Sequence, residues 1–407
     1  MAENPDARLL AVDVPAVAGS LAPNVQRSAN DTVTLSWLEP TDAGHRLRFS
    51  VWLDSHWSAP TTVSEGSGWF ANWADRPAVV ATTAPLWSAH WLVRRPAGGY
   101  AYDVYHAVSQ DSGKTWSEPK SPHRDNTDSE HGFVSHYATA KGAGLVWLDG
   151  RETTGHGAHS DRVAGMTLRG ATLESGGQVT DEQLIDSLVC DCCPTDAIQT
   201  PDGPVTVYRN RTEAEVRDIY YSRQIDGVWQ EGKPVANDGW VISGCPVNGP
   251  AIANKGNTVA VAWFTGAGDQ PKVRFARTDA IADGFGTPVD VLTGDTLGRV
   301  GLVLMDDGTA IVSALQKSES GQAALVLHLL DATGARLSRI VVSDNVPALT
   351  IPQLTESGNE LLIVWSDRGQ AEQSVFARRL VLSPAVAGTG TETAHAGPAV
   401  MLRLGGQ

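Results

Sequence analysis

The sequence has no apolar run close to the ~20 residues that a transmembrane helix requires, so no membrane span is expected. Lysine is scarce, and 31 basic against 46 acidic residues give a formal net charge of −15. Nucleic acids and anionic membranes bind clustered positive charge, so neither is an expected partner. A phosphate-cradling glycine loop is also missing, and no nucleotide or organic cofactor is therefore expected.

Helical patterning is almost absent, and one short apolar run returns along the chain instead. The run is centred on Trp37, Trp91, Trp147, Tyr208, Trp263, Ala314 and Trp365, at intervals of about 50 to 60 residues. A weaker strand ending in a glycine turn precedes it, and one or two further strands follow. Roughly four short strands per repeat predict an all-β fold, a β-propeller. The seven returns predict seven blades, or six if the unit around Ala314 or the first unit is merged.

We expect a single domain over residues 1–407. Its blades are predicted near residues 20–65, 73–120, 129–180, 188–237, 243–292, 296–343 and 345–382. The last unit lacks an obvious fourth strand. Either "RLLAVDV" near the N-terminus or "AVMLRL" near the C-terminus should therefore close the ring.

The stretch "SQDSGKTW", from Ser109 to Trp116, matches the pattern Ser-x-Asp-x-Gly-x-Thr-Trp at every position. In this motif, and in its repeat layout over essentially the whole chain, the sequence resembles the sialidase-like propellers with bacterial neuraminidase repeats, or Asp-boxes. The resemblance implies a hairpin turn on the outer rim of a blade. Asp111 would then accept backbone N–H groups, Gly113 would supply a positive φ, and Trp116 would pack inward.

Enzymes of this family, as the resemblance implies, use three arginines for a substrate carboxylate, a tyrosine nucleophile with a glutamate partner, and an aspartate acid/base. Arginines suited to a carboxylate are present here: Arg76, Arg151, Arg209, Arg211 and Arg299. The nucleophile would come from a late blade, yet no tyrosine follows Tyr221. Sialidase activity is therefore not expected. A lyase that uses His131 or His136 with Tyr137 is another glycan-active possibility.

Cysteine is scarce, with four in 407 residues, yet "VCDCCPTDA" holds three of them, Cys190, Cys192 and Cys193. The Ala-Ile pairs that begin at Ala197 and Ala251 occupy equivalent positions in two repeats and are 54 residues apart. By the same spacing, Cys245 is equivalent to position 191, within this cysteine-rich stretch. All four cysteines should therefore lie just before the innermost strands of neighbouring blades 4 and 5. In a propeller this position opens on the funnel face of the central channel, so we expect one cluster of thiols there.

Other residues should reach the same face, as judged from their distance to the recurrent run. They are Asp75 and Arg76 in blade 2, Glu130 and His131 in blade 3 and Arg299 in blade 6, together with Arg151, Glu152, His156 and His159 in the loop after the blade 3 run. Trp240 lies in a connection predicted to reach this face, where an indole could stack on a sugar or shield a metal.

Three interpretations of the cysteines remain open. In the first, Cys245 pairs with one of the three clustered cysteines, and a Cys190–Cys193 or a Cys192–Cys193 link forms beside it. In the second, the four cysteines and His131 bind a soft metal, with copper favoured and zinc second. In the third, one thiol is activated for redox chemistry by Arg209, Arg211 or His131.

The leading prediction is an exported protein, periplasmic or secreted with its signal peptide absent from this chain, that binds copper or zinc on its funnel face. Its ligand is accordingly a metal ion or a small or glycan molecule. The alternatives are a glycan-active hydrolase or lyase, and an interaction scaffold whose cysteines only form structural disulfides.

Overall fold

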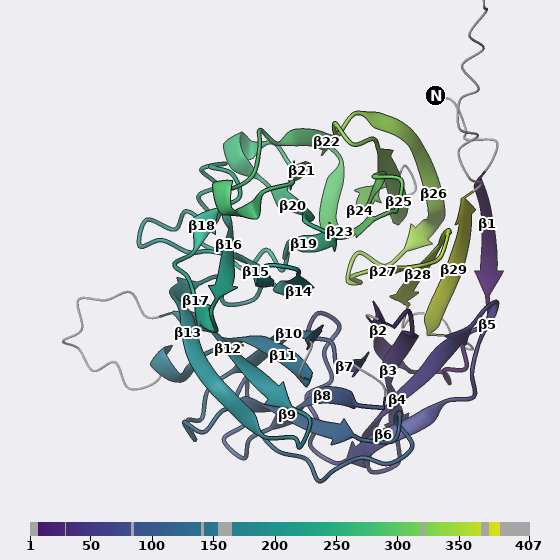
Figure 1. Ribbon diagram of the computed structural model, residues 1–407, viewed down its shortest axis with the longest axis vertical. Helices are drawn as coiled ribbons and strands as arrows, with labels where there is room; N and C mark the ends of the chain where they lie inside the picture. Colours follow the sequence, from purple (N-terminus) through teal and green to yellow (C-terminus); the bar gives the residue numbers. More distant parts are fainter. Residues whose placement is uncertain are drawn as a thin grey trace, which may run out of the picture.

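The computed structural model describes residues 7–28, 30–82, 85–139, 142–153, 165–318, 322–367 and 374–382. Seven antiparallel β-sheets stand around a central axis as the blades of a propeller (Figure 1). The prediction of an all-β, seven-bladed β-propeller is confirmed, and the six-bladed alternative is wrong. Helical structure in the described ranges is limited to three 3₁₀ turns, η1 (Arg151–Thr153), η2 (Ala267–Asp269) and η3 (Ile281–Asp283). None of them is long and apolar enough to cross a bilayer.

The first three sheets are each built in chain order from the innermost strand outward. The first contains β2 (Leu21–Arg27), β3 (Val33–Thr41) and β4 (Gly44–Leu53), with β5 (His56–Trp57) and β6 (Thr61–Gly66) both paired to β4. The second contains β7 (Ala78–Ala81), β8 (Trp87–Arg94) and β9 (Tyr102–Ser109). The third contains β10 (His131–Thr139), β11 (Gly142–Asp149), β12 (Met166–Glu174) and β13 (Val179–Val189).

The next three sheets follow the same order. The fourth contains β14 (Asp196–Thr200), β15 (Gly203–Arg209) and β16 (Ile219–Ile225), with β17 (Val228–Trp229) and β18 (Lys233–Pro234) both paired to β16. The fifth contains β19 (Ala251–Lys255), β20 (Thr258–Thr265), β21 (Lys272–Thr278) and β22 (Val289–Thr293). The sixth contains β23 (Thr296–Leu304), β24 (Ala310–Lys317), β25 (Ala323–Leu330) and β26 (Arg336–Val346).

The seventh sheet joins the two ends of the described chain. It contains β27 (Gln353–Ser357), β28 (Glu360–Ser366) and β29 (Val375–Leu382), and its outermost strand is β1 (Ala7–Val12). β1 runs antiparallel to β29, and Figure 1 shows the two strands side by side at the rim. The segment "RLLAVDV" thus supplies the strand that completes this blade, while "AVMLRL" lies outside the described residues.

The recurrent apolar run forms the second strand of every sheet: β3, β8, β11, β15, β20, β24 and β28. The central residues of these strands, from Trp37 to Trp365, are at most 3% exposed. Neighbouring blades cover both faces of each such strand, which is why the run is almost continuously apolar. One core cluster, for example, packs Val207 of β15 against Val261 of β20. The core therefore lies between the blades, and it fixes the positions of the loops at the strand ends.

The turn from Ser109 to Trp116 follows β9 and is held by its own side chains. Asp111 Oδ1 accepts the backbone N–H of Thr115 (2.8 Å), and Ser109 Oγ accepts the N–H of Gly113 (2.8 Å). The N–H and hydroxyl of Thr115 and the hydroxyl of Ser109 all donate to Asp111, and these hydrogen bonds lower its pKa to about 2. Gly113 has a φ of 81°, and Trp116 packs edge-on against Phe49 of β4. The turn is thus a structural element that fastens the outer edge of blade 2.

Candidate functional site: a four-cysteine cluster between blades 4 and 5

The four cysteines lie in the two loops that lead into the innermost strands of blades 4 and 5. Cys190, Cys192 and Cys193 follow β13 and precede β14, while Cys245 lies between β18 and β19. A disulfide joins Cys192 to Cys245, with 5.9 Å between their Cα atoms. The prediction that Cys245 returns to the triple-cysteine loop is therefore confirmed. We call these four residues the thiol site.

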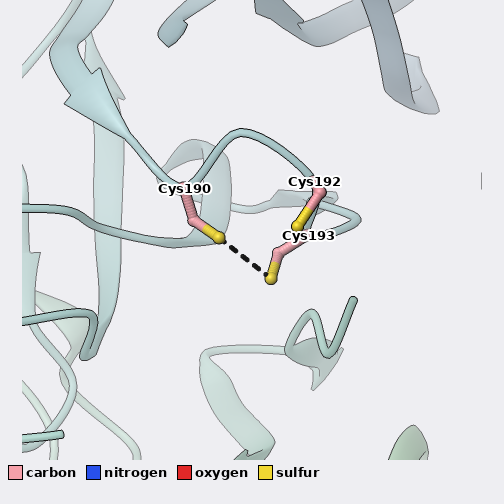
Figure 2. A group of neighbouring side chains, drawn as sticks. All are labelled: Cys190, Cys192 and Cys193. Carbon is pink, nitrogen blue, oxygen red and sulfur yellow. Dashed lines mark hydrogen bonds between the residues drawn. The ribbon is translucent and has the colours of Figure 1, made fainter. Parts of the chain in front are cut away.

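Cys190 and Cys193 are free thiols, and each is only 1% exposed. Their sulfurs face each other across the loop at hydrogen-bonding distance, 3.2 Å, as Figure 2 shows. The sulfurs of Cys190, Cys192 and Cys193 all lie within 4.8 Å of one another. The expected second disulfide, whether Cys190–Cys193 or Cys192–Cys193, is not formed, so that part of the structural interpretation is wrong.

Positive charge surrounds the sulfur of Cys190. The Arg217 Nη1–H donates to Cys190 Sγ (3.4 Å). The pKa of Cys190 is lowered, mainly by the hydrogen bond with Cys193, and further by the N–H of Cys192 and the charges of Arg209 and Arg217, which together outweigh burial. Burial and the neighbouring Cys190 raise the pKa of Cys193. Both shifts favour the negative charge on Cys190 and the proton on Cys193.

Arg209, predicted to bind a ligand, lies behind the channel wall instead. It is 2% exposed, and its guanidinium donates to the carbonyls of Asn248 (3.0 and 2.8 Å), Arg217 (2.6 Å) and Phe264 (2.7 Å). The remaining face of the guanidinium lies 4.7 Å from the ring centroid of Trp240, which is itself buried. Arg209 and Trp240 are thus buried against each other and not presented on the channel surface, which corrects both predictions.

A shallow groove opens over the disulfide. It is lined by Asp191, Arg211, Glu215, Arg217, Ser243, Gly244 and Cys245. Arg211 bridges Asp191 (3.0 Å) and Glu215 (2.6 Å), so its charge is already paired at the rim. Cys245 is exposed here, whereas Cys190 and Cys193 are buried beneath. The disulfide is thus the part of the thiol site that solvent reaches.

His131 is not part of the thiol site. Its ring stacks on His123, with 3.8 Å between centroids and 6° between planes, and its Nε2 lies 3.2 Å from Asp125 Oδ2. Burial lowers the pKa of His131, but Asp125, Asp149 and Asp103 outweigh burial and raise it overall. An ion cannot lie in the planes of two parallel, stacked imidazoles at once. His123 and His131 therefore do not ligate one ion together, although His131 with Asp125 and Asp149 forms a second group of possible metal ligands whose atoms lie within 4.8 Å of one another.

Arg151 belongs to this histidine–carboxylate group. It pairs with Asp149 (2.7 Å), with Glu182 (2.8 Å) and with Asp125 (3.4 Å). Glu152 is exposed and lies 3.9 Å from Arg169. His156 and His159 lie outside the described residues.

Arg76 and Arg299 line the same cavity at the mouth of the central channel. Residues of all seven innermost strands line this channel. Arg299 donates to the carbonyl of Pro246 (3.1 Å) and lies over the ring of Trp73 (5.1 Å). Burial lowers the pKa of Arg76 to about 10 and raises that of the nearby Asp196 to about 6.

A buried acid group that the sequence did not mark as a unit lies beside blade 2. Tyr102 Oη is 3.0 Å from Asp75 Oδ2 and 2.8 Å from Glu130 Oε1. A hydroxyl has one proton to donate, so both contacts form together only when one carboxyl group is protonated. Burial raises the pKa of Asp75 to about 6 and that of Glu130 to about 7. Gly132 permits this approach, because a Cβ there would lie 2.1 Å from Asp75 Oδ2.

This acid group should make stability fall as the pH rises. An unfolded glutamate titrates near pH ~4.3, whereas Glu130 titrates at about 7 in the fold, so the folded state binds more protons between these values. We expect the wild type to lose on the order of 2 kcal/mol more unfolding free energy than Glu130→Gln between pH 5 and pH 8. Urea unfolding at both pH values measures this difference. Asp128→Asn, at an exposed carboxylate nearby, should behave as wild type, and an unchanged pH dependence in Glu130→Gln would contradict the assignment.

No protein-family model matches the chain, and no curated protein matches it either. Among solved structures, the polysaccharide lyase Uly1 gives a TM-score of 0.54 at 10% identity, covering 89% of this chain and 90% of the lyase chain. A protein of unknown function from Dyadobacter fermentans gives 0.50 at 12% identity, with 93% and 100% covered. The GH93 α-L-arabinofuranosidase of Fusarium graminearum gives 0.50 at 11% identity, with 90% and 93% covered. These likenesses show the propeller fold alone, and they do not single out the sialidase-like group.

Proposed function

We propose that the protein is an exported propeller that binds a soft metal ion at the thiol site, with Cu(I) preferred and Zn(II) second. The observation that carries the proposal is the pair of buried free thiols, Cys190 and Cys193, whose sulfurs lie within 4.8 Å of the disulfide sulfur of Cys192. Thiolates select Cu(I) and Zn(II) over hard cations. The Cys192–Cys245 disulfide supports an oxidising compartment and therefore export.

The spacing of the sulfurs fits such an ion. Zn–S bonds of about 2.3 Å place tetrahedral sulfurs about 3.8 Å apart. The sulfurs of Cys190 and Cys193 are 3.2 Å apart, and each lies within 4.8 Å of the sulfur of Cys192. The buried pair supplies two ligands while the disulfide is closed, and its sulfurs would move apart from 3.2 Å to bind a two-coordinate Cu(I), which holds its sulfurs on opposite sides. Reduction of the disulfide would make Cys192 and Cys245 available as two further thiolates.

Metal titration tests this proposal. Anaerobic addition of Cu(I) in competition with a chromogenic chelator should give about one equivalent bound to the wild type. Because Cys193→Ser removes one of the two buried thiols, it should weaken binding about 100-fold or more. Cys245→Ser keeps both buried thiols and should still bind. The proposal is wrong if the wild type binds no metal, or if Cys193→Ser binds as tightly as the wild type.

A second candidate function, a glycan-active hydrolase or lyase, is favoured by the acid group. Glu130 lines an open cavity with Ser129, Tyr100 and Asp191, and its pKa near 7 suits a general acid at neutral pH. The named similar structures, a polysaccharide lyase and an arabinofuranosidase, act on glycans. Turnover of arabinan and uronate-containing polysaccharides, reduced 100-fold or more by Glu130→Gln but not by Glu118→Gln, at an exposed carboxylate outside this cavity, would support this function.

A scaffold with purely structural disulfides accounts for the Cys192–Cys245 bridge but not for two adjacent buried thiols. It is therefore the weakest of the three candidates.

A further inference from the structure

We propose that the thiol site is a two-electron relay in which the buried thiols Cys190 and Cys193 exchange with the exposed disulfide Cys192–Cys245. The relay would connect the buried pair to small-molecule thiols and disulfides in solvent. This activity goes beyond metal binding and requires no metal, because only the four sulfurs react.

The arrangement of the four sulfurs carries the proposal. Cys190 Sγ lies within 4.8 Å of Cys192 Sγ, so a nucleophilic sulfur is next to a disulfide sulfur. Both free thiols are 1% exposed and cannot meet a solvent oxidant directly. Cys245, in contrast, is exposed in the groove above. Electrons can therefore leave the buried pair only through the disulfide, as long as the fold stays closed.

The exchange balances without any added reagent. Cys190 thiolate attacks Cys192 Sγ, which forms a Cys190–Cys192 bond and releases Cys245 as a thiolate. Cys193 then attacks Cys190 Sγ, which forms Cys190–Cys193 and releases Cys192. The proton of Cys193 passes to the departing Cys192 sulfur, which lies within 4.8 Å of both. The buried pair has lost two electrons and the exposed pair has gained them. A small-molecule disulfide can then reoxidise Cys192 and Cys245, with release of two small thiols.

Arg217 is placed to assist the first step. Its Nη1 donates both to Cys190 Sγ (3.4 Å) and to the carbonyl of Gly244 (2.9 Å), the residue before Cys245. The guanidinium is thus held between the attacking sulfur and the loop that carries the leaving sulfur. Positive charge at this point favours the thiolate form of both. Glu215 fixes the guanidinium through a 2.7 Å ion pair.

Native-state labelling tests the relay. The metal-free wild type, in a chelating buffer without reductant, is incubated with a maleimide, and its cysteines are mapped by mass spectrometry. The expected result is label on Cys245 in molecules that carry a new Cys190–Cys192 or Cys190–Cys193 bond. Cys190→Ser keeps the disulfide but lacks the nucleophile, and should label Cys245 about tenfold more slowly or less. Arg217→Gln should slow labelling about fivefold.

Cys193→Ser is the matched control, because it also removes one buried thiol. It should still release Cys245 and should accumulate the Cys190–Cys192 bond. The relay is overturned if Cys245 in the wild type labels no faster than in Cys190→Ser, or if label depends on Cys193 and not on Cys190. Circular dichroism of each variant verifies the fold. Since no metal is present, the result is independent of whether copper or zinc binds.

Discussion

Arg209→Met should lower the free energy of unfolding by about 4 kcal/mol. The guanidinium donates to three backbone carbonyls, of Asn248, Arg217 and Phe264, and methionine can donate to none of them. Each buried carbonyl left without a partner costs about 1–3 kcal/mol. Arg209 also lowers the pKa of Cys190. The variant should therefore lose thiolate character at Cys190 as well as stability.

The measurement is urea unfolding of the variant beside Arg211→Met. Arg211 is two residues away and pairs with Asp191 and Glu215 near the surface, so its removal should cost at most about 1 kcal/mol. The pH dependence of thiol absorbance at 240 nm gives the second readout, with the Cys190 transition moved to higher pH in Arg209→Met only. Equal losses of stability in the two variants would refute the structural role assigned to Arg209.

The ring of blades could be predicted because every blade buries the same strand in the same way. Trp263 and Ala314 differ greatly in size, yet each is 0% exposed at the centre of a second strand. Burial on both faces leaves a run of apolar residues that survives such changes of side chain. Equivalent positions in neighbouring blades are then one repeat length apart in the sequence. This spacing predicted that Cys245 lies beside the cysteine loop of the preceding blade.

The choice of disulfide partner could not be predicted in the same way. Cys192 and Cys193 are adjacent, so the repeat assigns both to one position. The backbone of the loop decides which sulfur turns toward Cys245 and which turns inward to Cys190. Arg217 was missed for a related reason, because it lies in the connection between β15 and β16, where no residue pattern repeats between blades.

The directions of side chains near the channel could not be predicted from the sequence either, because the backbone is irregular at the start of several innermost strands. The pairing of β10 with β11 shifts register between Gly132 and Ser135, and Phe133 has a φ of 52°. Such a bulge changes the direction in which the neighbouring side chains point. The regular alternation of side chains along a strand therefore does not predict that His131 points toward Asp125. Arg299, with a φ of 56°, lies at a similar shift in β23.

Loss of the Cys192–Cys245 bridge should lower the free energy of unfolding by about 4 kcal/mol. The bridge joins residues 53 positions apart, so it removes the entropy of a long loop from the unfolded chain. It also ties the entry loop of blade 4 to that of blade 5, where the buried pair is held. Cys245→Ser should therefore destabilise the fold and make Cys190 and Cys193 more reactive toward a maleimide.

A comparison with and without a phosphine reductant separates the bridge from the serine substitution. Reduction of the wild type should lower its urea midpoint to that of Cys245→Ser, while the variant itself should not respond to the reductant. If reduction leaves the wild type unchanged, the bridge contributes no stability and the loops are held by their other contacts, such as those of Arg209, Arg217 and Arg299. A variant that responds to reductant as strongly as the wild type would show that another pair of cysteines has formed a bridge. That second outcome would place a bond among Cys190, Cys192 and Cys193, the three cysteines that remain in the variant, and peptide mapping would show which two are joined.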